Sequence, residues 1–301
     1  MAIVVFAHHK PDQLARLLSV LRHPQVRVYL HLDRQAQVEP FEHAFLEAGV
    51  SDVVMLRRYA HRWGSSGIVD ATVEGLRRGI EDGCSYFLLI SGQDFPLRPV
   101  SEIANFVEQA GSRSYVESSP LPMPCWRLGG RDRTDFYSYT ILGRRATCIP
   151  RGEDTSILNW KGQVLNQLLR ARSAFKPRRS FPAYARPYGG SNWLNLSRTA
   201  VEYVLRFMDE RPDYRRYHEH TLIPSEVFFH SILAVPDFAD RVEVVDDDLR
   251  FTIWPETSSH PRTLKTDDLP AMEGSGKLFG RKFDEEVDRT VLERLTERVT
   301  T

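Results

Sequence analysis

The sequence predicts an α/β fold, with a Rossmann-like, mostly parallel sheet and helices on both of its faces. The run Tyr86-Phe87-Leu88-Leu89-Ile90 has five bulky apolar residues in a row, too many for a half-exposed strand and too few for a buried helix. Three earlier apolar segments, over 3–8, 27–33 and 53–56, alternate with stretches of helical character. Strands that alternate with helices are joined by right-handed crossovers, so their sheet is expected to be parallel.

The helices of the first half follow from apolar spacing and from start signals. Pro11-Asp12 opens the first helix, which reaches about Arg22 with its leucines on one face. A second helix is expected over 39–48. A third is expected to run from a cap at Ser65-Ser66 to about Asp82.

Beyond about residue 112 the alternation loosens. Prolines at 120, 122 and 124 rule out a regular element there, and 178–187 is expected to be a basic, proline-containing loop. The remaining expected elements are a helix over 155–174, a Gly-rich turn and strand over 188–196, a helix over 199–208, a helix beginning at Ser225, short strands over 241–245 and 249–253, and a last helix around 287–299.

Bulk composition excludes some classes of protein. Among 301 residues, 40 Lys and Arg balance 40 Asp and Glu, so no overall charge points to nucleic acid. Two segments, 127–151 and 170–187, are rich in Arg and suit either an anionic partner or a solvated face. Three cysteines without a close pair fit a reducing compartment, and no apolar run is long enough to span a membrane. We therefore expect a cytoplasmic protein.

The end of the central strand is the first candidate for a site. Ser91-Gly92-Gln93-Asp94 puts a carboxylate at the strand's carboxyl end, where open α/β sheets bind ligands. An ordinary Asx turn, stopped by Pro96, is the alternative. The turn after the first strand, His8-His9-Lys10-Pro11-Asp12, has no glycine. A dinucleotide-binding oxidoreductase needs Gly-x-Gly-x-x-Gly there, so hydride transfer is disfavoured.

Glu226 is the carboxylate best suited to act as a base. Its neighbours Ile223, Phe228 and Phe229 predict surroundings of low dielectric constant, which raise a carboxyl pKa. The alternative is an acid in a first helical turn that complements the helix dipole.

Arg281 and Lys282 form a candidate anion site between Phe279 and Phe283. Arg offers phosphate a forked pair of donors, and Lys offers a point charge. The alternative is a basic turn paired with Asp284-Glu285-Glu286.

Three other motifs give weaker support for a functional site. Asp246-Asp247-Asp248 suits a metal, but a solvated acidic turn is the preferred reading. His218-Glu219-His220 lacks the spacing of the metalloprotease helix, and Gly190-Ser191-Asn192 does not continue as Gly-x-Ser-x-Gly. Metalloprotease and serine hydrolase activities therefore have little support.

Several segments together resemble one glycosyltransferase family, which contains the core-2/I-branching β-1,6-N-acetylglucosaminyltransferases and the peptide O-xylosyltransferases. The order and spread of these segments, from residue 3 to about 288, carry the resemblance. The segments are Val5-Phe6-Ala7-His8-His9-Lys10, His31-Leu32-Asp33, Ser91-Gly92-Gln93-Asp94-Phe95-Pro96-Leu97, Gly190-Ser191-Asn192-Trp193, Pro224-Ser225-Glu226-Val227-Phe228-Phe229-His230, Asp248-Leu249-Arg250-Phe251-Thr252-Ile253-Trp254 and Gly280-Arg281-Lys282-Phe283-Asp284.

The resemblance implies a single GT-A type catalytic domain over 1–301, with a nucleotide-binding half (1–117) and an acceptor-binding and catalytic half (118–301). It implies an inverting transfer of xylose or N-acetylglucosamine from a UDP-sugar to an acceptor hydroxyl, without metal or other cofactor. By match, Glu226 is the general base, and Arg281 and Lys282 replace the metal at the diphosphate. The expected donor-binding residues are His8, Asp33, Arg58, Trp63, Asp94, Arg262, Arg281 and Lys282, and the expected acceptor- or sugar-binding residues are Ser191, Asn192, Trp193 and Trp254.

One position departs from the xylosyltransferase pattern. Asn192 stands where those proteins have Asp in Gly-Ser-Asp-Trp, so the identity of the sugar that this chain binds is left open. The acceptor is expected to be a growing glycan or another metabolite, and a protein side chain is an alternative. Trp63 and Trp193 suit either sugar-stacking walls or core positions. Two other functions stay open: a non-catalytic glycan- or nucleotide-binding module, and a nucleotidyltransferase that holds a metal through Asp33 and Asp94.

Overall fold

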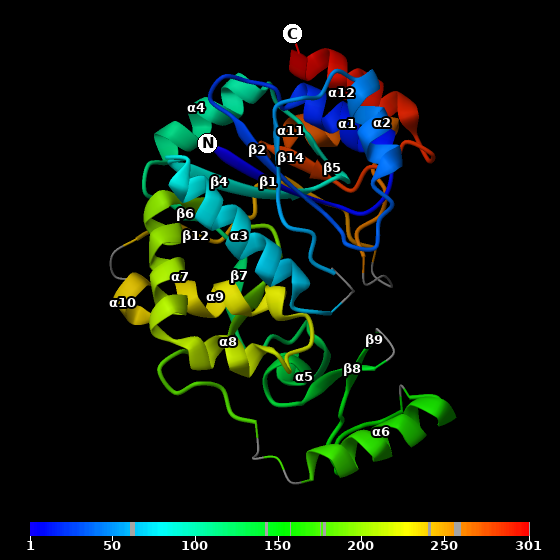
Figure 1. Ribbon diagram of the computed structural model, residues 1–301, viewed down its shortest axis with the longest axis vertical. Helices are drawn as coiled ribbons and strands as arrows, with labels where there is room; N and C mark the ends of the chain where they lie inside the picture. Colours follow the sequence, from blue (N-terminus) through cyan, green and yellow to red (C-terminus); the bar gives the residue numbers. More distant parts are fainter. Residues whose placement is uncertain are drawn as a thin grey trace.

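A computed structural model of the chain describes residues 1–60, 64–141, 144–156, 158–174, 176, 179–239, 242–255 and 260–300. Its centre is a seven-stranded sheet in the order β12-β6-β11-β4-β1-β2-β3 (Figure 1). The strands are β1 (Ala2–Ala7), β2 (Arg27–Leu32), β3 (Val53–Met55), β4 (Tyr86–Ser91), β6 (Ser114–Tyr115), β11 (Asn195–Ser197) and β12 (Val244–Val245). β1 is parallel to both β2 and β4, β2 is parallel to β3, and β11 alone runs antiparallel to its neighbours β4 and β6. The predicted mostly parallel sheet is confirmed.

Both faces of this sheet are covered, as the unbroken apolar runs predict. Every residue of β1 is buried. Ile3 and Val5 point into one core layer, and Val4 and Phe6 point into the other, because successive side chains of a strand alternate. The first layer is closed by α1 (Pro11–Val20), α2 (Glu39–Glu47), α4 (Val100–Ala110), α11 (Leu269–Gly274) and α12 (Arg289–Thr300). The second is closed by α3 (Gly67–Glu81), α7 (Arg198–Glu210), α8 (Pro212–His218), α9 (Phe228–Leu233) and α10 (Pro236–Ala239).

A second, three-stranded sheet joins the end of the chain to the end of β4. It contains β13 (Arg250–Phe251), β14 (Phe279–Arg281) and β5 (Asp94–Pro96). β14 runs antiparallel to β5, so that Arg281 pairs with Asp94 in the ladder. This register brings the two parts of the predicted site together.

The middle of the chain forms an extension beyond the sheet (Figure 1). It holds η1 (Arg127–Gly130), α5 (Arg131–Thr134), the hairpin of β8 (Ser138–Ile141) and β9 (Arg144–Thr147), and α6 (Trp160–Ser173). β7 (Ser118–Pro120) and β10 (Tyr188–Gly190) pair at its base.

Several sequence-based boundaries differ from the structure. A strand reaches Pro120, where no regular element was expected. Among the described residues β7 pairs with β10 alone, and a proline is tolerated on such an edge. The helix expected from Ser225 is a short 3-10 turn, η2 (Pro224–Glu226), followed by α9, so Glu226 precedes the helix. The helix expected over 155–174 begins only at Trp160, where Asn159 caps it. A further 3-10 turn, η3 (Thr266–Asp268), precedes α11.

Candidate active site

A cleft of about 520 Å³ opens at the carboxyl ends of β1 and β4. This is the edge at which an open α/β sheet binds ligands. The predicted residues that line it come from five separate segments: His8, Ser191, Asn192, Trp193, Glu226, Trp254 and Arg281.

Glu226 meets an arginine that the sequence did not single out. The Nε and Nη2 atoms of Arg133, on α5, donate to Oε2 of Glu226 at 2.9 and 2.8 Å. Burial raises the pKa of the Glu226 carboxyl above its usual value, and the charge of Arg133 opposes that rise. The carboxyl is therefore held in place and partly desolvated, with an open space beside it.

Arg133 is itself fixed on two further sides. Its Nη1 donates to Oδ1 of Asp132 at 3.0 Å, and its guanidinium lies 4.2 Å from the ring centre of Trp126. Arg133 falls in the Arg-rich segment 127–151, but that segment holds several arginines. The contact joins residues 93 apart, so spacing could not identify it.

Asp94 is buried and serves as the anchor of two arginines. Nε of Arg250 lies 3.2 Å from its Oδ1, and Nη1 of Arg281 lies 2.9 Å from its Oδ2. The backbone N–H of Ser91 donates to the same Oδ2 at 2.8 Å. With its charge already offset by two guanidinium groups, Asp94 is poorly suited to hold a metal ion. That weakens the nucleotidyltransferase alternative.

Arg281 reaches the cleft across an aromatic wall. Its guanidinium lies 4.4 Å from the ring centre of Trp193, and that of Arg250 lies 5.3 Å from the same ring. Trp193 lines the cleft and also packs on the second core layer. Its position therefore fits in part both a wall for a sugar ring and a core aromatic.

Two further predicted cations are not among the residues that line the cleft. Lys282 follows Arg281 through a cis peptide bond, and its carbonyl accepts the N–H of Leu264 at 2.9 Å. Arg262 pairs with Asp268, with Nη1 and Oδ2 2.8 Å apart. Of the three predicted cations, Arg281 is the one whose side chain is among the residues that line the cleft.

The residues expected to bind the nucleoside of the donor differ in burial and in their contacts. His8 stacks on His9 with ring centres 4.0 Å apart, and both line the cleft. Asp33 is buried after β2, where its Oδ1 accepts the N–H of Gln35. Arg58 donates to the carbonyl of Asp33 at 2.8 Å and so braces the end of β2. Trp63 lies outside the described residues.

The segment 190–193 forms one wall. Oγ of Ser191 donates to Oδ2 of Asp248 at 2.9 Å. Oδ1 of Asn192 is buried with no hydrogen-bond partner in the described part of the chain. An added Cβ on Gly190 would lie 1.9 Å from the Glu117 carbonyl oxygen, so only glycine fits there. Trp254, 59% exposed, lines the cleft where it meets solvent.

A second carboxyl in the cleft, Glu117, gave no signal in the sequence. Burial raises its pKa, with Asp248 and Asp246 contributing in the same direction. Because it lines the same cleft and has a raised pKa, Glu117 is the alternative to Glu226 as the general base.

The other acidic and basic clusters have local roles. Asp247 pairs with Lys277 at 2.8 Å, and Oδ1 of Asp246 accepts the N–H of Ser118, so this turn is hydrogen-bonded to its surroundings. Across the residues that the structure describes, no three His, Cys, Asp or Glu side chains are arranged to hold a metal ion. Arg179, in the basic loop, is buried and donates to the carbonyls of Phe136 and Tyr217 at 2.6 and 3.1 Å.

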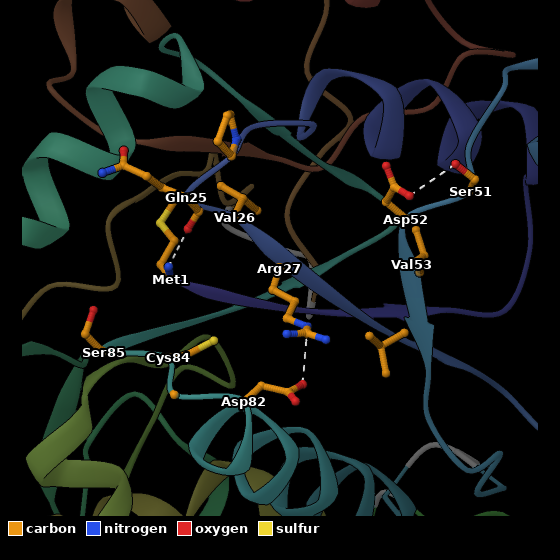
Figure 2. A pocket seen from close by; sticks show the side chains of 13 residues that line it. Met1, Gln25, Val26, Arg27, Ser51, Asp52, Val53, Asp82, Cys84 and Ser85 are labelled. Atoms are coloured by element: carbon orange, nitrogen blue, oxygen red, sulfur yellow. Dashed lines mark hydrogen bonds and ion pairs between the residues drawn. The ribbon is translucent and has the colours of Figure 1, made fainter.

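A larger hollow of about 680 Å³ lies at the opposite edge of the sheet (Figure 2). Its visible polar contacts are an Arg27–Asp82 ion pair of 3.3 Å, a hydrogen bond between Ser51 and Asp52, and one from the Met1 amine to the Gln25 carbonyl. These are mutual contacts of surface groups at the amino ends of parallel strands. We therefore place the candidate site in the smaller cleft.

The fold and the cleft together define a GT-A-like glycosyltransferase architecture. A sequence model of the family described as Core-2/I-Branching enzyme matches residues 1–273, and the chain belongs to that family. This membership indicates a glycosyltransferase.

Named relatives fit this assignment. The chain is similar to human xylosyltransferase 2, with 25% identity over 94% of this chain and 31% of the relative. Mouse xylosyltransferase 2 matches with the same identity and coverage. Human xylosyltransferase 1 is 22% identical over 98% of this chain and 30% of its own length. The chain thus spans less than a third of the length of these relatives. No helix among the described residues is long and apolar enough to cross a membrane.

Proposed function

We propose that this chain is an inverting glycosyltransferase that moves xylose or N-acetylglucosamine from a UDP-sugar to an acceptor hydroxyl without a metal or other cofactor. The observation that carries the proposal is one cleft lined both by a partly buried carboxyl, Glu226, and by a guanidinium, Arg281. Inverting transfer needs a base on the acceptor side and positive charge on the leaving-group side. The similarity to xylosyltransferases supports the xylose option.

Glu226 is assigned as the general base. In the reaction its carboxylate takes the proton from the acceptor hydroxyl while that oxygen attacks the anomeric carbon and the bond to UDP breaks. A raised pKa makes the carboxylate a stronger base, and the pairing with Arg133 keeps it ionised and oriented.

Arg281, with Lys282 beside it, is assigned to the departing diphosphate. Asp94 fixes the Arg281 guanidinium through one nitrogen, Nη1, and the cleft is open to the side chain. A preorganised cation of this kind stabilises charge as it develops and needs no reorganisation in the reaction. Lys282 has no ion-pair partner among the described residues, which leaves its charge available to a ligand.

The remaining parts of the proposal are the site walls and the setting. We assign four residues to the end of the cleft that binds the donor: His8, Asp33, Arg58 and Asp94. Of these, His8 lines the cleft, and the other three support its wall without lining it. Ser191, Asn192, Trp193 and Trp254 are assigned to the sugar or acceptor, and the orphan Oδ1 of Asn192 is suited to accept a hydrogen bond from a sugar hydroxyl. A cytoplasmic location and the division at 117/118 belong to the same proposal.

Calorimetric titration with UDP, in EDTA and again with Mn²⁺, tests the assignment together with a turnover assay on UDP-xylose and UDP-N-acetylglucosamine. We expect UDP to bind equally in both buffers and at least one donor to be turned over in EDTA. Binding that requires Mn²⁺ would refute the metal-free assignment. Binding without turnover of any donor would favour the non-catalytic module.

A further inference from the structure

One side of α6 carries a stripe of three exposed apolar side chains. Trp160, Val164 and Leu168 are 72%, 56% and 64% exposed. They are spaced four residues apart and therefore lie along one side of the helix. The helix is held by its other side, where Leu169 joins a small core with Tyr139 and Cys148. The outer stripe is thus not needed to hold α6 in place.

The helix also stands in the most basic part of the chain. Residues 127–187 contain thirteen Lys and Arg against four Asp and Glu, a formal net charge of +9. Since the whole chain has zero net charge, the remainder carries −9. Lys161 and Arg172 are exposed at the two ends of α6, and within the described residues neither forms an ion pair. Figure 1 shows α6 at the end of the molecule farthest from the large sheet.

We propose that α6 docks on the surface of an anionic membrane, with Trp160, Val164 and Leu168 in the interface and Lys161 and Arg172 against the headgroups. A helix with an apolar stripe, a tryptophan and flanking cations lies in the plane of such an interface. Each added cation near an anionic leaflet strengthens binding about fivefold. The inference is independent of the proposed transfer reaction.

Charge favours this occupant over a second copy of the chain. A stripe set in a region of charge +9 repels itself in a two-fold dimer, whereas an anionic surface complements it. The stripe is one side of a single protruding helix, and a flat lipid surface can receive it without a matching groove.

The test is co-sedimentation of the full chain with phosphatidylcholine vesicles, with and without phosphatidylglycerol. We expect binding only to the anionic vesicles, and weaker binding as salt is raised. The double variant Trp160→Ser/Leu168→Ser is expected to bind roughly tenfold more weakly or worse, because it removes two of the three inserted side chains. Lys161→Gln/Arg172→Gln is expected to lose a comparable factor.

Leu46→Ser is the matched control, because Leu46 is the most exposed large apolar residue described and lies on α2, away from α6. It should bind as the wild type does. Circular dichroism melting checks that each variant is folded, and the charge pair keeps the test decisive if the apolar pair does not fold.

Three results would overturn the inference. The first is no binding to anionic vesicles, or equal binding to neutral ones. The second is anionic binding that both α6 variants leave unchanged. The third is a stable dimer in sedimentation velocity that Trp160→Ser/Leu168→Ser dissociates, which would assign the stripe to a second copy instead.

Discussion

Arg281 lies opposite Asp94 in the β5–β14 ladder, and its Nη1 donates to Oδ2 of Asp94 at 2.9 Å across 187 residues of sequence. The other oxygen of the same carboxylate faces Nε of Arg250, whose side chain is fully buried. One buried carboxylate thus ties the end of the central strand to the cation assigned to the diphosphate. The structural role of Asp94 and the proposed role of Arg281 are therefore coupled.

Asp94→Asn should destabilise the fold and weaken UDP binding together. The change leaves the Arg250 guanidinium buried without a counter-charge, which costs about 3 kcal/mol in comparable buried pairs. Urea unfolding measures the stability, and calorimetry measures UDP affinity. Glu102→Gln, which breaks only the exposed Arg98–Glu102 pair, is the control and should change stability by about 0.5 kcal/mol or less. Unchanged stability in Asp94→Asn would contradict the coupling.

Arg281→Ala and Arg262→Ala should separate two cations that were both expected to bind the donor. Arg281 lines the cleft, whereas Arg262 is committed to Asp268. We expect Arg281→Ala to lower kcat by about 10²-fold or more, as for the loss of an oxyanion donor, and Arg262→Ala to leave it nearly unchanged. Lys282→Ala belongs in the same series and should weaken UDP binding. Steady-state kinetics with the turned-over donor would decide, and equal losses in Arg281→Ala and Arg262→Ala would refute the distinction.

The central sheet was predictable because its signal is local. Five apolar residues from Tyr86 to Ile90 indicate burial on both faces, and the β4 strand with its two core layers follows from them. The ladder of β14 on β5 was not predictable, since three-residue strands far apart in sequence have no period to detect.

The site was predictable only as a set of separate segments. The family resemblance grouped the motifs around Asp94, Glu226 and Arg281. In the structure Arg281 contacts Asp94, and Arg281 and Glu226 line the same cleft. Arg133 and Glu117 were missed, since neither stands in a motif and both act through contacts made by the fold.

Glu226→Gln should abolish transfer and keep UDP affinity. The amide cannot accept the acceptor proton, so kcat should fall by about 10²- to 10⁴-fold, while the diphosphate contacts are untouched. Glu117→Gln is the matched control, because it removes the other carboxyl with a raised pKa in the same cleft and should retain most activity. If Glu117→Gln is the inactive variant and Glu226→Gln turns over normally, the base is Glu117 and not Glu226.

The pH profile should report Glu226 and its arginine. Burial raises the pKa of Glu226 and Arg133 opposes the rise, so the acid limb of kcat/KM should lie above the usual range for Glu, with activity lost as pH falls through it. Arg133→Gln removes the opposing charge and should move that limb to higher pH by roughly one unit or more, since a nearby cation lowers a carboxyl pKa by that much. The same raised pKa means that the folded state binds this proton more tightly than the unfolded chain does. The carboxyl therefore contributes stability below its unfolded pKa, and that contribution is lost as pH rises through the folded value. Arg262→Gln, which removes a cation outside the cleft lining, should leave the limb in place. A limb that stays put, or moves to lower pH, in Arg133→Gln would show that another group carries the proton.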